Sequence, residues 1–193
     1  DDATRAHLRA LRPGGVVLFG RNVHDGAQVR ALIADLRATC GPELLVCIDQ
    51  EGGLVVRFTR DVTVFPGNMA LGAAGRPDLA EAQGRASGAE LAALGFDVNF
   101  APVCDLADDP ENPGLGLRSL GSDPARAGLL AAALIRGTRV GGLASSAKHF
   151  PGLGGARVDP HLGMPRIDAS AVRLRASHLE VFARSLAAGV ETV

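Results

Sequence analysis

The sequence alternates short apolar runs with segments of helix length, and this alternation constrains the fold more than any other feature. Apolar runs at residues 16–19, 44–48, 98–103 and 143–147 are separated by segments in which apolar side chains recur at helical spacing. Nearly continuous apolar strands are typical of parallel sheets that helices cover on both faces. The sequence therefore predicts an α/β fold with a parallel sheet, either doubly wound or closed as a barrel.

Helix starts support the same assignment. Asp25 and Gln28 resemble a capping box, and Asp123 with Pro124 forms an N-cap followed by proline, which opens a helix that we expect to end near Gly137. Further helices are predicted near the N-terminus and over residues 77–94 and 171–188, with one more strand at 190–193. This gives about five strands, whereas a closed barrel needs roughly eight and about 250 residues.

Polar residues follow three of the predicted strands. They are the segment 49–53, Asp105, and the pair Lys148–His149. In α/β barrels the carboxyl ends of the strands carry the chemistry, so these clusters favour a barrel over an open sheet. No internal repeat or low-complexity linker interrupts the chain, and we expect residues 1–193 to form a single domain.

Charge and composition restrict the partners. Twenty Lys and Arg residues oppose 21 Asp and Glu residues without long blocks of one sign, and the chain has no Trp or Tyr. Nucleic-acid binding is therefore not expected, and a small neutral or weakly charged ligand fits better. No apolar run approaches the roughly 18 residues of a membrane span. The three cysteines, Cys40, Cys47 and Cys104, show no CxxC spacing and are interpreted as buried free thiols.

Two polar segments have both a functional and a structural interpretation. Asp49 ends a buried strand and can accept hydrogen bonds from sugar hydroxyls, with Arg57 reaching back to the same pocket; taken alone, a plain strand-to-loop turn is favoured. Arg118 stands in a Gly/Pro-rich loop, where its guanidinium offers a rigid donor fork, although an exposed arginine is the simpler alternative. No phosphate-binding glycine motif is present, so nucleotide binding ranks low.

The segment KHFPG is more specific, because a charged pair directly follows a buried strand. Successive side chains on a strand point to opposite faces, so Lys148 and His149 serve one site only if the chain bends there. The sequence Phe150-Pro151-Gly152 supplies such a bend. We therefore interpret this pair as functional.

Asp159 and His161 are spaced so that both side chains lie on one side of an extended segment. An aspartate beside a histidine fixes its tautomer, which makes the histidine usable as a general acid and then as a base. The glycines that precede the pair are typical of a mobile catalytic lid. An Asp-Pro turn with an exposed histidine is the alternative. A metal site that also uses His149 is disfavoured, because no helical i, i+4 pair of ligands is present.

In order and spacing, the segments GGVVLFGRN, IDQEGGLVVR, NFAPVCDL, NPGLGLRSLGSDP, AKHFPG and VDPHLGMP resemble bacterial β-N-acetylhexosaminidases of glycoside hydrolase family 3. The resemblance implies a TIM-like (β/α)8 barrel, here a partial barrel that lacks the first and last strands, whose pocket holds a terminal N-acetylglucosamine. It implies that His161 is the proton donor and acceptor with Asp159 as its partner. The sugar-binding residues that it implies are Asp49, Arg57, Arg118, Lys148 and His149.

The resemblance also implies a reaction, which is retaining hydrolysis of β-N-acetylglucosaminides derived from peptidoglycan, with no cofactor or metal. An aspartate attacks the anomeric carbon, while the histidine protonates the departing oxygen and then deprotonates water. In the family that aspartate lies on a strand later than Val193. No residue of this chain is assigned the role, and we expect the chain to be an incomplete barrel domain.

Several positions depart from the family pattern. Leu153 and Gly155 replace a histidine and an aspartate, Leu117 replaces an acid, and Leu54 replaces a frequent arginine. The changes at Leu117, Leu153 and Gly155, with the missing nucleophile, favour one alternative, a non-catalytic or degenerate sugar-binding protein. A glycoside phosphorylase variant is a second alternative, because a neutral histidine base repels an anionic acceptor less than a carboxylate does. The compartment, whether cytoplasmic or at the cell wall, and the oligomeric state are left open as well.

Overall fold

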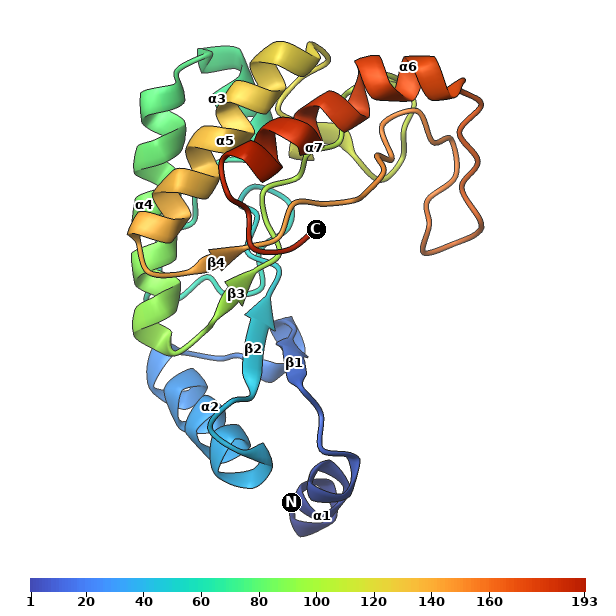
Figure 1. Ribbon diagram of the computed structural model, residues 1–193. Helices are drawn as coiled ribbons and strands as arrows, with labels where there is room; N and C mark the ends of the chain where they lie inside the picture. The colour runs from blue at the N-terminus through green and yellow to red at the C-terminus, as the bar shows by residue number, and fades with distance from the viewer.

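The computed structural model describes residues 1–193 and contains one parallel sheet of four strands (Figure 1). The strand order is β1-β2-β3-β4, so each strand lies beside its predecessor in the chain. In a doubly wound sheet the strand order reverses near the centre, and in this sheet it does not. The topology is that of part of a (β/α) barrel, which confirms the predicted fold. The strands are β1 (Gly15–Leu18), β2 (Leu45–Ile48), β3 (Val98–Asn99) and β4 (Ala144–Ser145).

Helices connect the strands and lie along one side of the sheet (Figure 1). Helix α2 joins β1 to β2, α3 and α4 join β2 to β3, and α5 joins β3 to β4. The bounds are α1 (Asp2–Leu11), α2 (Gly26–Cys40), α3 (Asn68–Ala74), α4 (Pro77–Leu94), α5 (Pro124–Val140), α6 (Ala171–Ala176) and α7 (His178–Ala187), with 3₁₀ turns η1 (Gly20–Asn22) and η2 (Gly116–Arg118). None of these helices is long and apolar enough to cross a membrane.

The core lies between the sheet and the helices. Val46 and Ile48 of β2 are fully buried, whereas Leu45 is 50% exposed. Burying one such aliphatic side chain contributes about 1.5–3 kcal/mol, so the packed face holds the helices to the sheet. Two apolar clusters fill this layer, one centred on α2 and β2 and the other between α5 and α7.

Helices α4 and α5 approach each other closely because glycines replace side chains at their contact. A Cβ at Gly84 would overlap the carbonyl oxygen of Leu134, and one at Gly137 would overlap that of Glu81. Each glycine therefore faces the backbone of the other helix. This contact fixes the distance between two of the helices behind the sheet.

Several element boundaries differ from the predictions. The runs 98–103 and 143–147 form strands of only two residues each, and beyond them Val103 makes a single parallel pair with Lys148. The predicted strand 190–193 is reduced to one parallel pair, Ser146 with Thr192.

The helix predictions need three corrections. Helix α5 continues three residues past Gly137, to Val140. The predicted helix 171–188 breaks into α6 and α7 at Ser177, whose φ of −123° and ψ of −98° are not helical. Helix α3 was not predicted from the sequence.

The sheet register determines where the polar segments meet. Ile48 pairs with Asn99, and Asn99 pairs with Ser145, so the carboxyl ends of three strands lie at one level. The next residues of each strand therefore emerge at the same edge of the sheet. The polar segment 49–53, Asp105 and the pair Lys148–His149 are brought together in this way.

Candidate functional site

A buried glutamate organises the carboxyl end of the sheet. The Glu51 side chain is 2% exposed and accepts hydrogen bonds from Arg118 Nε and Nη2, both at 2.8 Å. Lys148 Nζ lies 2.7 Å from the same carboxylate. A buried carboxylate is costly without partners, and two cations compensate this one. Glu51 therefore holds Arg118 and Lys148 in fixed positions.

Arg118 is held from three directions. Besides its bidentate contact with Glu51, its Nη1 donates to the carbonyl oxygen of Gly114 at 2.8 Å. Its Nη2 lies 3.2 Å from His149 Nε2. The hydrogen bonds to Glu51 raise the pKa of Arg118 above its ordinary value, with burial opposing them. The guanidinium is thus a fixed, permanently charged donor in this site.

Asp49 and Arg57 complete a cluster of alternating charges. Asp49 Oδ1 accepts a short hydrogen bond from Lys148 Nζ, and Asp49 Oδ2 lies 3.7 Å from Arg57 Nη2. Arg57 also lies over the ring of Phe19, with its guanidinium carbon 5.6 Å from the ring centre. Lys148 and His149 both reach the site, as predicted for a chain that bends after β4.

His149 pairs with Asp105, which follows β3. The His149 Nδ1 to Asp105 Oδ2 distance is 2.6 Å, and the Asp105 side chain is completely buried. Asp105 Oδ1 also accepts a hydrogen bond of 2.7 Å from the backbone N–H of Leu153. One carboxylate therefore contacts both the strand-end histidine and the start of the following loop.

The predicted dyad lies on that loop. His161 Nδ1 is 2.7 Å from Asp159 Oδ1, and the same oxygen accepts the backbone N–H of His161 at 2.9 Å. This backbone hydrogen bond and then the ring lower the pKa of Asp159. The His161 side chain is 85% exposed, and its Nε2 has no hydrogen-bond partner in the protein. The two side chains are in contact as predicted, but not through an extended segment: the Leu162 N–H donates to the Asp159 carbonyl oxygen at 2.9 Å, so the residues form a turn with an exposed histidine, as in the alternative interpretation.

A cavity of about 500 Å³ joins the two Asp–His pairs. Arg118, His149 and Asp105 line one part of it, and Asp159 and His161 line another. Its apolar lining comes from Leu54, Val55, Leu115, Leu153, Ala156 and Val158. Small-ligand sites typically have such volumes, with apolar walls and a few convergent polar groups.

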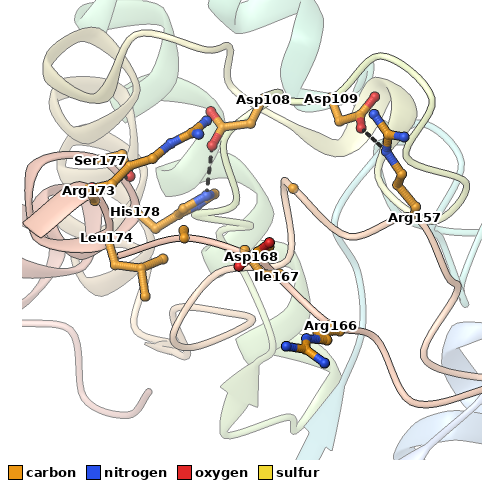
Figure 2. Close-up of a pocket in the computed structure, with 12 residues that line it drawn as sticks. Asp108, Asp109, Arg157, Arg166, Ile167, Asp168, Arg173, Leu174, Ser177 and His178 are labelled. Atoms are coloured by element: carbon orange, nitrogen blue, oxygen red, sulfur yellow. Dashed lines mark hydrogen bonds and ion pairs between the residues drawn. The ribbon is translucent and has the colours of Figure 1, made fainter. Parts of the chain in front are cut away.

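The loop that carries Asp159 and His161 lines both this cavity and a second one of about 450 Å³, which Figure 2 shows. Leu153, Ala156 and Val158 face the first cavity, whereas Gly155 and Arg157 line the second. Figure 2 shows two ion pairs that border the second cavity. Arg157 Nε lies 2.9 Å from Asp109 Oδ2, and the buried His178 Nε2 lies 3.0 Å from Asp108 Oδ2.

Backbone contacts hold the root of this loop. Asn112 Nδ2 donates to the carbonyl oxygens of Leu153 and Gly154, at 2.7 and 3.2 Å. Together with Asp105, these bonds fix residues 153–154 through main-chain atoms. The polar anchors that the sequence lacks at Leu153 and Gly155 are therefore not the loop's only means of attachment.

Geometry brings together all seven residues that the sequence singled out, in one cluster and one cavity rim. The sequence analysis did not include Glu51 or Asp105 in the site, although both lie in the polar segments that follow β2 and β3. Their near-complete burial was the missing information. No group of three His, Cys, Asp or Glu side chains lies close enough to hold a metal ion.

The chain is similar to curated bacterial proteins over most of its length. It is 42% identical to a beta-hexosaminidase of Pseudomonas aeruginosa over 183 residues, covering 93% of this chain and 54% of that protein. It is 40% identical to a beta-hexosaminidase of Chromobacterium violaceum, covering 100% of this chain and 55% of that protein. The chain thus spans about half the length of these relatives.

Solved structures show the same similarity in three dimensions. A glycoside hydrolase family 3 β-N-acetylglucosaminidase from a Paenibacillus species superposes with a TM-score of 0.95 at 39% identity, covering all of this chain and 38% of that one. NagZ from Neisseria gonorrhoeae, in complex with N-trifluoroacetyl-D-glucosamine, superposes with a TM-score of 0.93 at 35% identity, covering 100% and 58%. The family model for the glycosyl hydrolase family 3 N terminal domain matches residues 1–193. The chain therefore belongs to glycosyl hydrolase family 3, and its residues are those of the N-terminal domain.

Proposed function

We propose that the protein hydrolyses terminal, non-reducing β-N-acetylglucosamine residues with retention, and that its natural substrates are glycosides derived from peptidoglycan. The observation that carries this proposal is one cavity with the fixed guanidinium of Arg118 on one side and an Asp–His pair with a free Nε2 on the other. The names of the relatives support it. Curated relatives are beta-hexosaminidases, and one similar structure holds an N-acylated glucosamine analogue.

In this proposal the sugar binds against the charged cluster. Arg118 and Lys148 donate to its oxygens, and Asp49 accepts from its hydroxyls. Glu51 keeps the two cations oriented before the sugar arrives. Because these groups are held by one another, little side-chain entropy is lost on binding.

His161 then supplies the proton transfers. With Nδ1 bonded to Asp159, the protonated Nε2 gives its proton to the departing glycosidic oxygen as the C–O bond breaks. After the aglycone leaves, neutral Nε2 takes a proton from water as water attacks the anomeric carbon. No residue of the chain is assigned the nucleophile that would hold the glycosyl group between these steps.

The departures at Leu153 and Gly155 bear on how the loop delivers His161. In this proposal the exposed His161 ring moves toward the bound sugar, while residues 153–154 stay attached through Asp105 and Asn112. Closure around a hinge at a loop root is a common way to complete a catalytic site.

The test is the release of nitrophenol from nitrophenyl N-acetyl-β-glucosaminide by the full-length protein, with nitrophenyl β-glucoside as the matched control substrate. We expect release from the acetylated sugar alone, and release of N-acetylglucosamine from disaccharide fragments of peptidoglycan. The rate is measured with and without phosphate, because a neutral histidine repels an anionic acceptor less than a carboxylate does. Stimulation with formation of a sugar phosphate would assign phosphorolysis instead. Binding of N-acetylglucosamine without any release would assign a sugar-binding protein.

A further inference from the structure

Asp105 is the most deeply buried acid of the site, and each of its oxygens serves a different donor. Its side chain is 0% exposed; Oδ2 accepts from His149 Nδ1 at 2.6 Å, and Oδ1 accepts from the Leu153 N–H at 2.7 Å. The backbone N–H of His149 lies 3.3 to 3.4 Å from the same carboxylate. Both oxygens of this buried carboxylate are therefore engaged by donors of the protein itself.

The contacts of His149 determine which ring nitrogen carries the proton. Arg118 has only donors and stays protonated in proteins, and its Nη2 lies 3.2 Å from His149 Nε2. Arg118 cannot turn away, because Glu51 binds it through two hydrogen bonds. Nε2 is therefore the acceptor, and the proton is on Nδ1, which donates a hydrogen bond to Asp105.

The charges of the cluster agree with a neutral His149. Three carboxylates, Asp49, Glu51 and Asp105, face three permanent cations, Arg57, Arg118 and Lys148. A protonated His149 would place a donor against the Arg118 donor and add an unbalanced charge to a largely buried cluster.

We propose that Asp105 is a positioning residue that fixes the Nδ1–H tautomer of His149 and ties this ring to the root of the loop carrying Asp159 and His161. His149 then orients Arg118 and shapes the sugar pocket, but it transfers no proton. The loop starts from a fixed point next to the sugar. The effect on turnover rests on the proposed glycosidase function, whereas the tautomer does not.

Asp105→Asn is the informative change, because asparagine has one acceptor oxygen where two donors need one each. Either the His149 Nδ1–H or the Leu153 N–H must then face an NH₂ group, or His149 must move its proton to Nε2 and oppose Arg118. Nitrogen-15 NMR of the labelled histidine rings reports the tautomer, with the His149 signals assigned by their loss in His149→Gln. We expect Nδ1–H in the unmodified protein. In the variant we expect an altered or mixed tautomer and a loss of kcat/KM of roughly 10- to 100-fold.

Asp97→Asn is the matched control. Asp97 also accepts a backbone N–H, from Val46 at 2.7 Å, and an arginine, Arg37 at 2.8 Å, but it precedes β3 at the opposite end of the sheet. Loss of this carboxylate should lower stability and leave both the His149 tautomer and kcat/KM unchanged. A merely structural role for Asp105 would make the two variants behave alike.

Two results would overturn the proposal: a proton on Nε2 of His149 in the unmodified protein, or an Asp105→Asn variant that keeps both the tautomer and full kcat/KM. The first does not depend on Asp105→Asn, so it decides the matter even when that variant does not fold. If the unmodified protein releases no nitrophenol, the proposed function fails alone. The tautomer and the affinity for N-acetylglucosamine then still test Asp105.

Discussion

The two Asp–His pairs of the cavity have nearly the same internal geometry and opposite surroundings. Nδ1 lies 2.6 Å from the carboxylate in Asp105–His149 and 2.7 Å in Asp159–His161. The first histidine is 32% exposed with its Nε2 facing Arg118, and the second is 85% exposed with Nε2 free. Proton transfer needs a nitrogen that can gain and lose a proton, so the contacts of Nε2 distinguish the roles of the two histidines.

A third pair shows that the contact itself carries no function. His24 Nδ1 lies 2.9 Å from Asp25, on the surface at the start of α2, where Asp25 caps the helix through the N–H of Gln28. Neither residue lines the cavity. This pair supplies a control for experiments on the other two.

The largest expected effect comes from His161→Ala. Removing a general acid and base should lower turnover by about 100- to 10,000-fold, while N-acetylglucosamine binding stays unchanged because the charged cluster remains. Steady-state kinetics with the nitrophenyl substrate and calorimetric binding measure both. His24→Ala should leave both values unaltered. Full activity in His161→Ala would reverse the roles assigned to the two pairs.

Glu51→Gln tests the surroundings of the Asp105–His149 pair. The change leaves Arg118 and Lys148 buried without their shared carboxylate, and breaking a buried ion pair in this way costs about 3–5 kcal/mol of unfolding free energy. We expect sugar affinity to fall with it, as measured by denaturant unfolding and by calorimetry.

Glu81→Gln is the control for this change, since it removes an exposed ion pair with Arg136 at 3.1 Å. Such a pair is worth about 0–1 kcal/mol. Equal losses in the two variants would show that burial gives Glu51 no special weight.

Gly154→Ala tests how the loop that carries Asp159 and His161 is held. A Cβ at Gly154 would overlap the carbonyl oxygen of Leu106 and crowd the His178 ring, so the loop root must shift. A displacement of about 1 Å can cost up to about 100-fold in turnover, and binding of the sugar should change little. Gly155→Ala, whose nearest contact would be Ile167 at an ordinary 3.5 Å, is the neighbouring control. Indistinguishable kinetics of the two variants would contradict the role of the loop root.

The smallest expected effect is a change in the pKa of Asp159. His161 lowers the pKa of Asp159 from 3.8, first through its backbone N–H and then through its ring, so the carboxylate stays charged above the lowered value and loses its charge as pH falls through it. In His161→Ala the ring contribution disappears, and the pKa should rise toward 3.8 while the backbone bond keeps part of the shift. Carbon-13 NMR of the Asp159 carboxyl measures this. An unchanged pKa would mean that the ring does not contact the carboxylate in solution.

Sequence reasoning succeeded where local chemistry decides the outcome. The apolar runs predicted the parallel sheet, and Asp25 and Asp123 predicted the starts of α2 and α5. The contact of Asp159 with His161 was also predicted, although it forms in a turn and not in an extended segment. It failed at boundaries that distant contacts set. The break at Ser177 and the two-residue length of β3 follow from packing and backbone pairing that no local pattern encodes.

The sequence by itself determined the residue types of the site and their positions at strand ends, because hydrophobic periodicity and turn residues are local properties of the chain. Only the tertiary structure decided what each residue does. Glu51 and Asp105 became organising acids because the register of β2, β3 and β4 buries them beside Arg118, Lys148 and His149. Burial and the far-side contact of a ring depend on segments up to about a hundred positions apart, as Lys148 and Asp49 are, and only the folded chain brings those together.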